Sequence, residues 1–498
     1  MLQFGDFLPD LAADGNPGLT VARNVLPRSP SSYGPMAGLS AYSSALTARC
    51  QGAISVTDNS GNANVFAGDV SKLYRLVSGS TSFSDVSKVG GYACGSDQLW
   101  SFVVFGNRVI AMNVTDPIQS FVMGTSALFA DLAAAAPKAR YAAVVRDFVV
   151  FANIVDAVDG SQPQRVHWPA IDDPTNWPTI GSASAAAVQS DRQDLLGDGG
   201  WNQGIVGGLG TADGAIIQEH AVWRMTYVGP KIIFAFDRVE GARGSPAPGS
   251  IVQLGALCYY LGEDGFYAFD GSNSRAIGAQ KVDKYFFADV DTSYLYRVTA
   301  AIDPLSKLVF WSYPGAGSSN GTPNKMLIYN WSLDRWSQAE VDCEMLARSL
   351  TFGYTLDGLD AISSSLDALP ASLDSRLWTG GRLLLGAFDT AHKLATFTGS
   401  NLEALIETGE FNGDGSRVFV TGLRPRVDGG TVTAAVGYRD TQDGALTYTT
   451  ESSPNAATGI CPQKISARYA RARVKVAAGG SWNHVRGVDP TMRVAGLR

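Results

Sequence analysis

A short hairpin unit recurs along most of the chain and constrains its fold more than any other feature. In each copy, a strand rich in β-branched and aromatic residues ends at a Gly, Asn or Asp turn, and a second such strand follows. In one copy, Trp100–Phe105 and Arg108–Met112 flank the turn Gly106–Asn107. Two-residue turns of this kind are the preferred way to reverse a twisted strand pair. The chain is therefore predicted to be all-β.

The spacing of these units predicts the architecture. Successive copies lie about 35 to 80 residues apart, a spread centred near the repeat length of four-stranded propeller blades. A propeller also closes radially and so protects the edges of its sheets. We predict a β-propeller of about six to eight blades, and a multi-sheet sandwich or barrel with the same turn chemistry is the alternative.

The two ends of the chain differ from this middle region. Residues 1–47 are rich in Pro, Gly and Ser and predict an extended arm, whereas 48–399 carry the propeller pattern with insertions. From about residue 400, longer alternating segments such as Thr431–Val436 predict a small β-sandwich at 400–498. Because a closed propeller brings its ends together, we expect the arm and the C-terminal module to form one discontinuous platform domain.

A segment at 355–376 has its own pattern. Three Leu-Asp pairs recur there at a spacing of seven, and they contain Asp360, Asp367 and Asp374. Leucine at heptad spacing is a helix-packing signal, but Pro370 and the Ser content oppose a long helix. We predict a short helical or looped insertion between blades, with a low-complexity linker as the alternative. If the three aspartates face a lumen they would repel phosphates, so they are candidate channel-lining residues.

The charge balance argues against a protein that grips nucleic acid. The chain has 39 basic and 46 acidic residues, for a net charge of −7, whereas nucleic-acid binding normally needs a basic stripe. The richest basic stretch occupies near-alternating positions of a predicted strand: Arg468, Arg471, Arg473 and Lys475. Alternation predicts one solvated or interface-facing face of that strand, and specific DNA recognition is the alternative.

Motifs that carry catalysis or hold metals are missing from the sequence. Its five cysteines are widely spaced without a C-x-x-C pair, and its four histidines are dispersed. The glycine-rich run Gly197–Gly204 lacks the Gly-Lys-Ser/Thr ending of a P-loop. It is expected to provide tight turns or to let another backbone approach closely. We therefore expect no catalytic, cofactor-binding or metal-binding residues, and no enzymatic activity.

A glycoside hydrolase is the enzymatic alternative, because that chemistry needs two carboxylates across a cleft, one with a raised pKa. The candidates are Glu219, Glu263, Asp264 and Asp270, and the two aspartates stand in Asp-Gly turn dipeptides that need no catalytic role. A sugar-stacking platform of tryptophans is also conceivable, although their spread over several blades favours core filling. These tryptophans are Trp168, Trp177, Trp201, Trp223, Trp311, Trp331 and Trp336.

Targeting signals are also missing. The start, Met1–Asp6, lacks the basic region and apolar run of a signal peptide, and no stretch approaches 18 uncharged apolar residues. The cysteine usage suits folding in a reducing cytoplasm. We expect no membrane-spanning segment.

Several segments together resemble the nozzle proteins of podoviruses, the short-tailed phages, which are also called tail-hub or packaged-DNA-stabilisation proteins. The resemblance covers most of the chain, and its motifs are structural turns and strands. The segments that carry it are Leu8–Asp10, Asn16–Gly18, Ala22–Pro27, Gly214–Phe287, Leu327–Trp331 and Ser365–Asp374.

The resemblance implies a propeller plus a platform, assembled as a homo-hexameric ring below the portal and the tail adaptor (the head-to-tail connector). Such a ring forms the lower tail tube in the virion, retains packaged DNA and conducts it during ejection. Tail fibres or spikes and a tail needle or plug would be further partners, and double-stranded DNA would pass without specific binding. The chain would be made in the host bacterial cytoplasm and would carry no cofactor. The alternative is a propeller-type tail component that binds or hydrolyses host surface polysaccharide.

Overall fold

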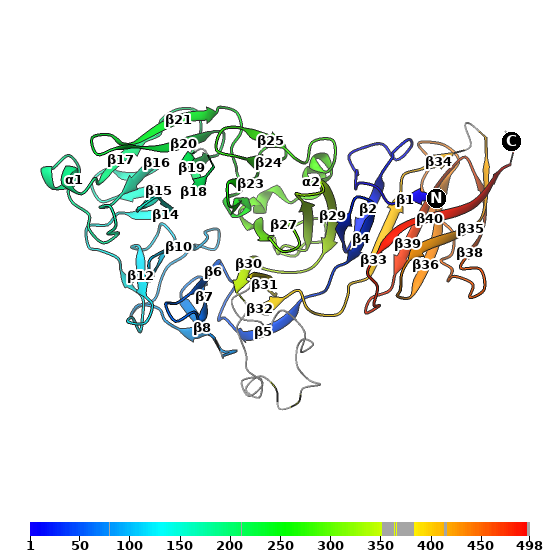
Figure 1. Cartoon of the computed structure of the whole chain (residues 1–498), viewed down its shortest axis with the longest axis horizontal. Coiled ribbons are helices and arrows are strands. Elements are labelled where there is room, and N and C mark those ends of the chain that lie inside the picture. Colours follow the sequence, from blue (N-terminus) through cyan, green and yellow to red (C-terminus); the bar gives the residue numbers. More distant parts are fainter. Residues whose placement is uncertain are drawn as a thin grey trace.

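The fold is taken from a computed structural model that describes residues 1–78, 80–210, 212–350, 363, 365, 383–412 and 416–495. Two lobes lie side by side in Figure 1: a large ring of sheets and a smaller β-sandwich that carries both chain ends. The first is the predicted propeller and the second the predicted platform. The all-β fold class is therefore confirmed.

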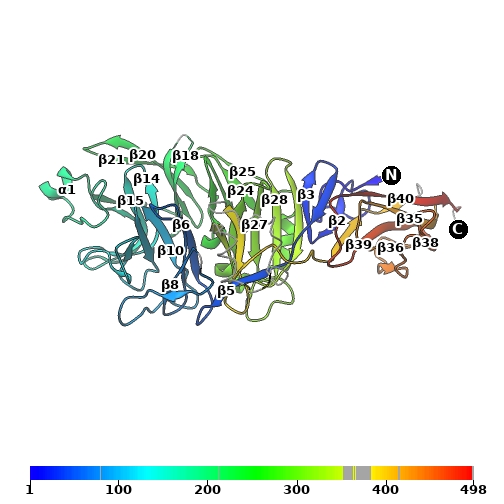
Figure 2. The ribbon, with the colours of Figure 1, turned by 60° about the horizontal axis from the view of Figure 1, so that its bottom comes forward.

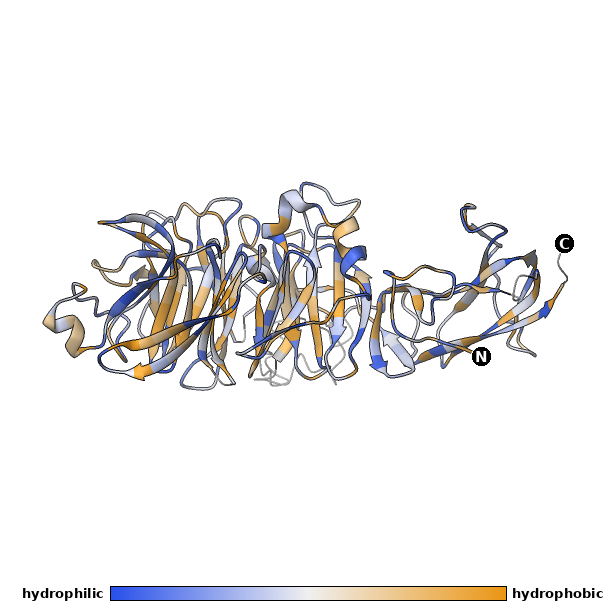
Figure 3. Cartoon of the chain, turned by 90° about the horizontal axis from the view of Figure 1, so that it is seen from above, coloured by the Kyte–Doolittle hydropathy of each residue, from blue (hydrophilic) through white to orange (hydrophobic). Residues whose placement is uncertain are grey.

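Seven four-stranded antiparallel blades form the propeller within the described residues. Figure 2 shows them standing around the ring, and Figure 3 shows hydrophobic residues concentrated along their strands. Blade one has β6 (Gly52–Thr57), β7 (Ala63–Gly68), β8 (Leu73–Val77) and β9 (Ser84–Asp85). Blade two has β10 (Ser101–Phe105), β11 (Arg108–Met112), β12 (Gln119–Val122) and β13 (Ala130–Asp131). Blade three has β14 (Lys138–Val145), β15 (Phe148–Asp156), β16 (Gly160–Trp168) and β17 (Asp191–Asp194).

The remaining blades follow in chain order. Blade four has β18 (Asn202–Leu209), β19 (Ala212–Gln218), β20 (Val222–Gly229) and β21 (Ile233–Glu240). Blade five has β22 (Val252–Leu254), β23 (Leu257–Leu261), β24 (Phe266–Phe269) and β25 (Ser274–Ala276). Blade six has β26 (Thr299–Asp303), β27 (Leu308–Tyr313), β28 (Lys325–Asn330) and β29 (Arg335–Glu340). Blade seven has β30 (Met345–Leu350), β31 (Leu383–Phe388), β32 (Lys393–Thr396) and β5 (Ser40–Ala45). Short helices lie between strands: α1 (Ala183–Ala187), α2 (Asp283–Asp289), η1 (Pro248–Ser250) and η2 (Thr292–Arg297).

The ring closes with a strand from the other end of the chain. β5 precedes blade one in sequence, yet it pairs antiparallel with β32 through Lys393↔Ala45 and Ala395↔Ala41. The expected arm at 1–47 is therefore not wholly part of the platform. β5 lies in the Pro-, Gly- and Ser-rich region 1–47, which predicts an arm, and its own sequence, Ser-Ala-Tyr-Ser-Ser-Ala, lacks the β-branched pattern of the other blades. Its pairing covers the edge of blade seven that would otherwise stay open.

A buried side-chain contact strengthens this closure. Glu344, just before β30, lies 2.6 Å from His392 Nδ1 and accepts a 3.1 Å hydrogen bond from the Cys50 backbone N–H, just before β6. Burial raises the pKa of Glu344 above its ordinary value. The contact joins the last blade to the first.

The platform consists of two sheets formed by both ends of the chain. One has the order β3 (Val25–Ser29), β4 (Ser32–Pro35), β40 (Val485–Val494), β35 (Val418–Val427) and β38 (Cys461–Ala467), with β1 (Leu2–Gln3) also on β40. The other has β2 (Leu19–Arg23), β33 (Ala404–Thr408), β39 (Tyr469–Val476), β36 (Val432–Arg439) and β37 (Thr447–Tyr448), with β34 (Phe411–Asn412) on β39. The expected association of the arm with the C-terminal module is thus present.

The second platform sheet continues into the propeller. β2 pairs with β33 on one side and meets β29 of blade six in parallel on the other, so a single ten-stranded sheet crosses both lobes. Asn24 reinforces the crossing: its N–H bonds Gln338 O at 2.8 Å, and its side chain accepts from the Glu340 N–H at 2.9 Å and donates to Glu403 O at 2.9 Å. Its φ of 57° is a left-handed conformation that Asn tolerates well.

One hydrophobic core spans the same junction. Phe4, Phe7 and Tyr33 of the N-terminal region belong to the cluster that contains Trp311 and Trp336 of blade six. The same cluster continues into the C-terminal strands of the platform. The two lobes therefore share both a sheet and a core.

Candidate functional site

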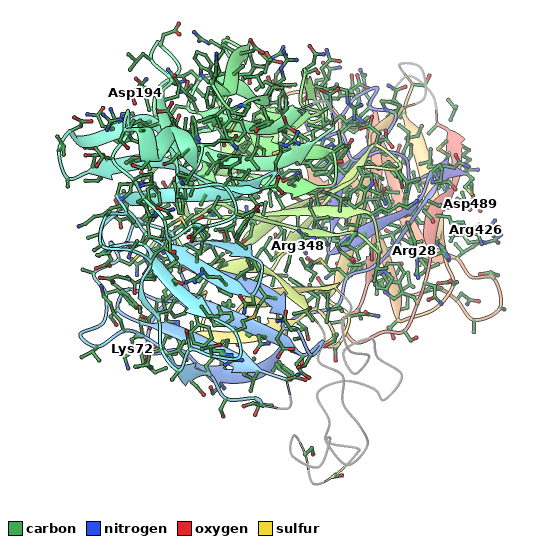
Figure 4. The ribbon with its side chains drawn as sticks, turned by 60° about the vertical axis from the view of Figure 1, so that its left-hand side comes forward. Arg28, Lys72, Asp194, Arg348, Arg426 and Asp489 are labelled. Atoms are coloured by element: carbon green, nitrogen blue, oxygen red, sulfur yellow. The ribbon has the colours of Figure 1, made fainter. Side chains whose placement is uncertain are left out.

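The central cavity of the propeller is one candidate site. It has a volume of about 510 Å³ and is lined largely by the first strands of the blades. Apolar side chains such as Ile54, Phe102 and Met345 dominate the lining, and Arg348 adds one guanidinium (Figure 4). Burial lowers the pKa of Arg348, and its Nε has no hydrogen-bond partner among the described residues. The wall is thus mainly apolar, unlike the basic surfaces that bind phosphates.

The aspartates expected to line a channel, Asp360, Asp367 and Asp374, lie outside the described residues. They belong to the connection between β30, whose residues line the cavity, and β31. Their proposed role stays a prediction.

The basic run on β39 is neutralised within the platform. Residues of β39 alternate between buried small side chains and partly buried charged ones, as predicted. Arg473 Nε bonds Glu407 Oε1, and Arg471 lies 3.0 Å from Glu410, which also pairs with Arg439 at 2.8 Å. Both glutamates are buried. On the face predicted to be solvated or interface-facing, Arg471 and Arg473 are therefore paired with buried glutamates, which the alternation alone could not reveal.

A second, exposed row of charges crosses the junction between the lobes. Arg23 lies 3.1 Å from Glu340 and 3.7 Å from Glu403, while Lys475 lies 3.5 Å from Glu403 and 3.4 Å from Glu451. These groups alternate in sign across β29, β2, the residue just before β33, β39 and the segment that follows β37. Exposed pairs contribute little individually, about 0–1 kcal/mol each. The row therefore favours the observed strand order more than it stabilises the fold.

The four hydrolase candidates each have a structural partner. Glu219 accepts hydrogen bonds from the Trp201 N–H and from the Gln203 side chain, and Glu263 lies 3.1 Å from His220. Asp264 accepts a 2.7 Å hydrogen bond from the Tyr267 hydroxyl.

Asp270 bonds the backbone N–H groups of Asn273 and Ser272, which hold its pKa below the ordinary value. A general acid for glycoside hydrolysis needs the opposite shift.

One unusual carboxyl was missed by the sequence reasoning. Asp283, at the start of α2, is buried, and this burial raises its pKa to about 7. A Cβ added at Gly278 or Gly265 would come within 2.0 Å or 2.3 Å of its oxygens, so these glycines make room for it. Asp283 Oδ1 accepts a 3.2 Å hydrogen bond from the Phe266 N–H. The Asp-Gly and Ile-Gly turns were visible in the sequence, but their convergence on one carboxyl was not.

We predict that Asp283→Asn stabilises the protein increasingly from about pH 4 and most above pH 7. The unfolded chain releases this proton near pH 4, whereas the folded chain holds it to about pH 7, so the associated stability is lost as pH rises from 4 to 7. Asn stays neutral, and after allowance for partial solvent access we expect a gain of about 1–2 kcal/mol at pH 8.5 and almost none at pH 4.5. Thermal unfolding at both pH values measures this. Asp270→Asn is the control, and an equal effect of D283N at both pH values would refute the assignment.

The seven tryptophans considered for sugar stacking differ in exposure. Trp168, Trp177, Trp311 and Trp336 are buried, as core filling predicts, and Trp223 and Trp331 are partly buried, whereas Trp201 has 53% of its surface exposed. In the parts of the chain that the structure describes, all five cysteines are free and buried, and no group of three or more His, Cys, Asp or Glu residues could hold a metal ion. Among the same residues, no helix is long and apolar enough to span a membrane.

Comparison with known proteins finds solved structures that are similar, but no matching family or curated protein. No family model matches the chain, and no curated protein matches it. Among solved structures, a chain from "Crystal Structure of Mitotic Checkpoint Complex" is similar, with 10% identity and a TM-score of 0.37. The match covers 69% of this chain and 87% of that chain. At this identity and score, the likeness carries no argument about function.

Proposed function

We propose that the chain is a structural subunit of the lower tail tube, or nozzle, of a short-tailed phage, and that it works as a ring of identical copies rather than as an enzyme. The ten-stranded sheet that joins blade six to the platform carries this proposal. A tube-wall subunit has to keep its lobes in a fixed relation while DNA passes. A shared sheet and a shared core meet that need, and the resemblance described above supplies the biological setting.

The lining of the propeller cavity favours a conduit between subunits. The cavity of about 510 Å³ is lined mainly by apolar side chains, whereas a duplex is a highly charged rod. We therefore place the DNA path between copies of the chain rather than through one propeller. A lumen for DNA therefore needs several copies around an axis, and closed symmetric rings are the usual way to make one. The resemblance implies six copies.

The charge distribution of the chain is compatible with the wall of a tube through which DNA passes without binding. Contacts from Lys and Arg to phosphates are what make DNA bind. The chain carries a net charge of −7, and the arginines Arg471 and Arg473 are already paired with Glu407 and Glu410. The platform carries both chain ends and is our choice for the contact with the tail adaptor (Figure 1).

This proposal predicts that virions assembled without the chain lose their DNA and regain retention when the purified chain is added. Retention is expected because the ring would seal the DNA inside the particle. A dye that binds only DNA released from the particles measures it. Cryo-electron microscopy of the repaired particles should show a ring of copies at the tail tip, and native mass spectrometry should give their number.

Two outcomes would overturn the proposal. Particles that keep their DNA without the chain would show that it does not retain the genome. A chain that binds the tail only as a single copy would exclude a tube wall.

A further inference from the structure

The glycine-rich run after blade three positions an exposed tryptophan. The chain leaves β17, turns through Gly197 at φ 145° and Gly200 at φ 76°, and enters β18 just after Trp201. A Cβ at Gly199 would lie 2.0 Å from the Gln218 side chain, and one at Gly200 would lie 2.2 Å from Glu219 Oε2. Only glycine therefore lets this run lie against the end of β19. Both expected features are present: tight turns at Gly197 and Gly200, and a close backbone approach in which the His220 N–H bonds Gly199 O at 2.9 Å.

Hydrogen bonds then fix the backbone of Trp201, and its indole ring remains exposed to solvent. Glu219 Oε2 accepts the Trp201 N–H at 3.0 Å, and Trp201 O accepts the Glu219 N–H at 3.1 Å. The indole is 53% exposed, and no described residue bonds its Nε1. It is the one exposed aromatic side chain among the described residues. Tryptophan usually buries its ring, so a fixed, outward ring is a ready contact surface.

Polar side chains surround a small hollow beside this ring. The hollow has a volume of about 290 Å³, and besides Trp201 and Glu219 its lining includes Gln162, Gln164, Arg165 and Asp194. Figure 4 labels Asp194 on this lobe.

These polar groups are held in place by partners within the chain. Gln164 Nε2 bonds the Gly197 and Gly200 carbonyls at 3.2 and 3.0 Å, which leaves its carbonyl oxygen available. Buried Arg165 holds Asp194 through hydrogen bonds of 2.6 and 2.9 Å. The hollow is thus preorganised before any ligand arrives.

We propose that this hollow binds one or two rings of an uncharged sugar, with a ring face stacked on Trp201 and hydroxyls bonded to Gln162, Gln164 and Asp194. An aromatic platform flanked by fixed polar groups suits a ligand with one apolar face and several hydroxyls. The volume lies just below the range of about 300–1,000 Å³ for drug-sized ligands, so a long chain would be held by a short part of its length.

The charged residues of the hollow determine which sugars can bind and whether a bound sugar can be cleaved. Asp194 and Glu219 outnumber Arg165, so sulfated or carboxylated sugars would be repelled. Hydrogen bonds from Arg165 lower the pKa of Asp194, which keeps it an acceptor and makes it unsuitable as a general acid. The site therefore binds without cleaving. This inference does not depend on the tail-tube proposal.

Affinity electrophoresis of the full chain tests the site directly. Native gels contain dextran, glycogen or galactan as neutral probes, or alginate or heparin as anionic ones. We expect retardation by at least one neutral probe and none by the anionic probes. Trp201→Ala should weaken the apparent affinity at least ~10-fold, whereas Trp201→Phe keeps part of it. Ile232→Ala, which truncates an exposed apolar side chain on the same lobe, is the matched control and should bind like the wild type.

Each contrary result would overturn the inference. Retardation by none of the neutral probes, or by the anionic probes alone, would refute an uncharged-sugar site. Equal retardation of the wild type and W201A would show binding elsewhere. A W201A variant that fails to join tails yet migrates like the wild type in every gel would assign the ring to a subunit contact. Circular dichroism confirms that each variant is folded.

Discussion

Replacing Arg335 with Ala is expected to lower the free energy of unfolding by about 3–5 kcal/mol. Arg335, at the start of β29, is only 2% exposed. Its guanidinium donates to the carbonyls of Phe4, Gly5 and Ser29. Without it, buried carbonyls of the N-terminal segment lose a charged donor, and the desolvation cost of an unsatisfied group remains.

Further contacts of Arg335 add to this cost. Its Nε lies 3.0 Å from Asp6 Oδ1, and its guanidinium carbon lies 4.4 Å from the centre of the Tyr33 ring. Burial raises the pKa of the Tyr33 hydroxyl well above its ordinary value, so the ring stays neutral beneath the cation. One side chain thus fastens the start of the chain to blade six.

Urea denaturation followed by tryptophan fluorescence measures the loss. Arg28→Ala is the matched control, because Arg28 is an exposed arginine of the same region with a single hydrogen bond to Asn483 O. We expect R28A to cost less than ~1 kcal/mol. Arg335→Lys should lie between, since one ammonium cannot reach all three carbonyls with a planar fork. A stability of R335A within ~1 kcal/mol of the wild type would contradict the assigned role.

Glu407→Ala should destabilise the platform by a similar amount, about 3–5 kcal/mol. Glu407 is 2% exposed on β33, bonds Arg473 and lies 3.7 Å from Arg471. The Tyr448 hydroxyl also donates to this carboxylate and lies 3.1 and 3.0 Å from its two oxygens. Removing the carboxylate would leave two partly buried guanidinium groups with fewer partners, and breaking one half of a buried pair costs far more than the pair contributes.

Glu403→Ala is the matched control on the neighbouring exposed row. Glu403 pairs with Arg23 and Lys475 in solvent, so its loss should cost less than ~1 kcal/mol and less again in 1 M salt. The E407A effect should be nearly independent of salt, because burial shields the network from screening ions. Equal losses of stability in E403A and E407A, or a strong salt dependence of both, would contradict this role. They would show that the ion pairs of Glu407 contribute no more than an exposed ion pair.

Local sequence patterns were enough to predict the propeller. Blades one to six begin with hairpins whose turns, such as Gly106 before β11, are set by residues a few positions apart. The alternation of Ala and Arg along β39 likewise predicted which side chains point inward. These features depend on neighbours along the chain, so one sequence reveals them.

Candidate site residues were predicted less well. The Gly197–Gly204 run predicts tight turns or a close backbone approach, but nothing in the sequence singles out Trp201 from the buried tryptophans. Exposure is decided by which elements pack over a ring. Of the four hydrolase candidates, Asp264 and Asp270 bond residues two or three positions away, as their turn dipeptides predict. Glu219 and Glu263 have partners that only folding brings close.

The sequence by itself determined the all-β class, the repeated blades and the two unlike ends. Only the tertiary structure decided that Ser40–Ala45 closes blade seven, that β2 joins blade six to the platform, and that Arg335 and Glu407 hold the two ends in place. These contacts join residues tens to hundreds of positions apart, and no local periodicity encodes them. Closure of the ring brings β5, near the start of the chain, beside β32, and β1 pairs with β40 in the platform, so these partners are fixed only in the folded chain.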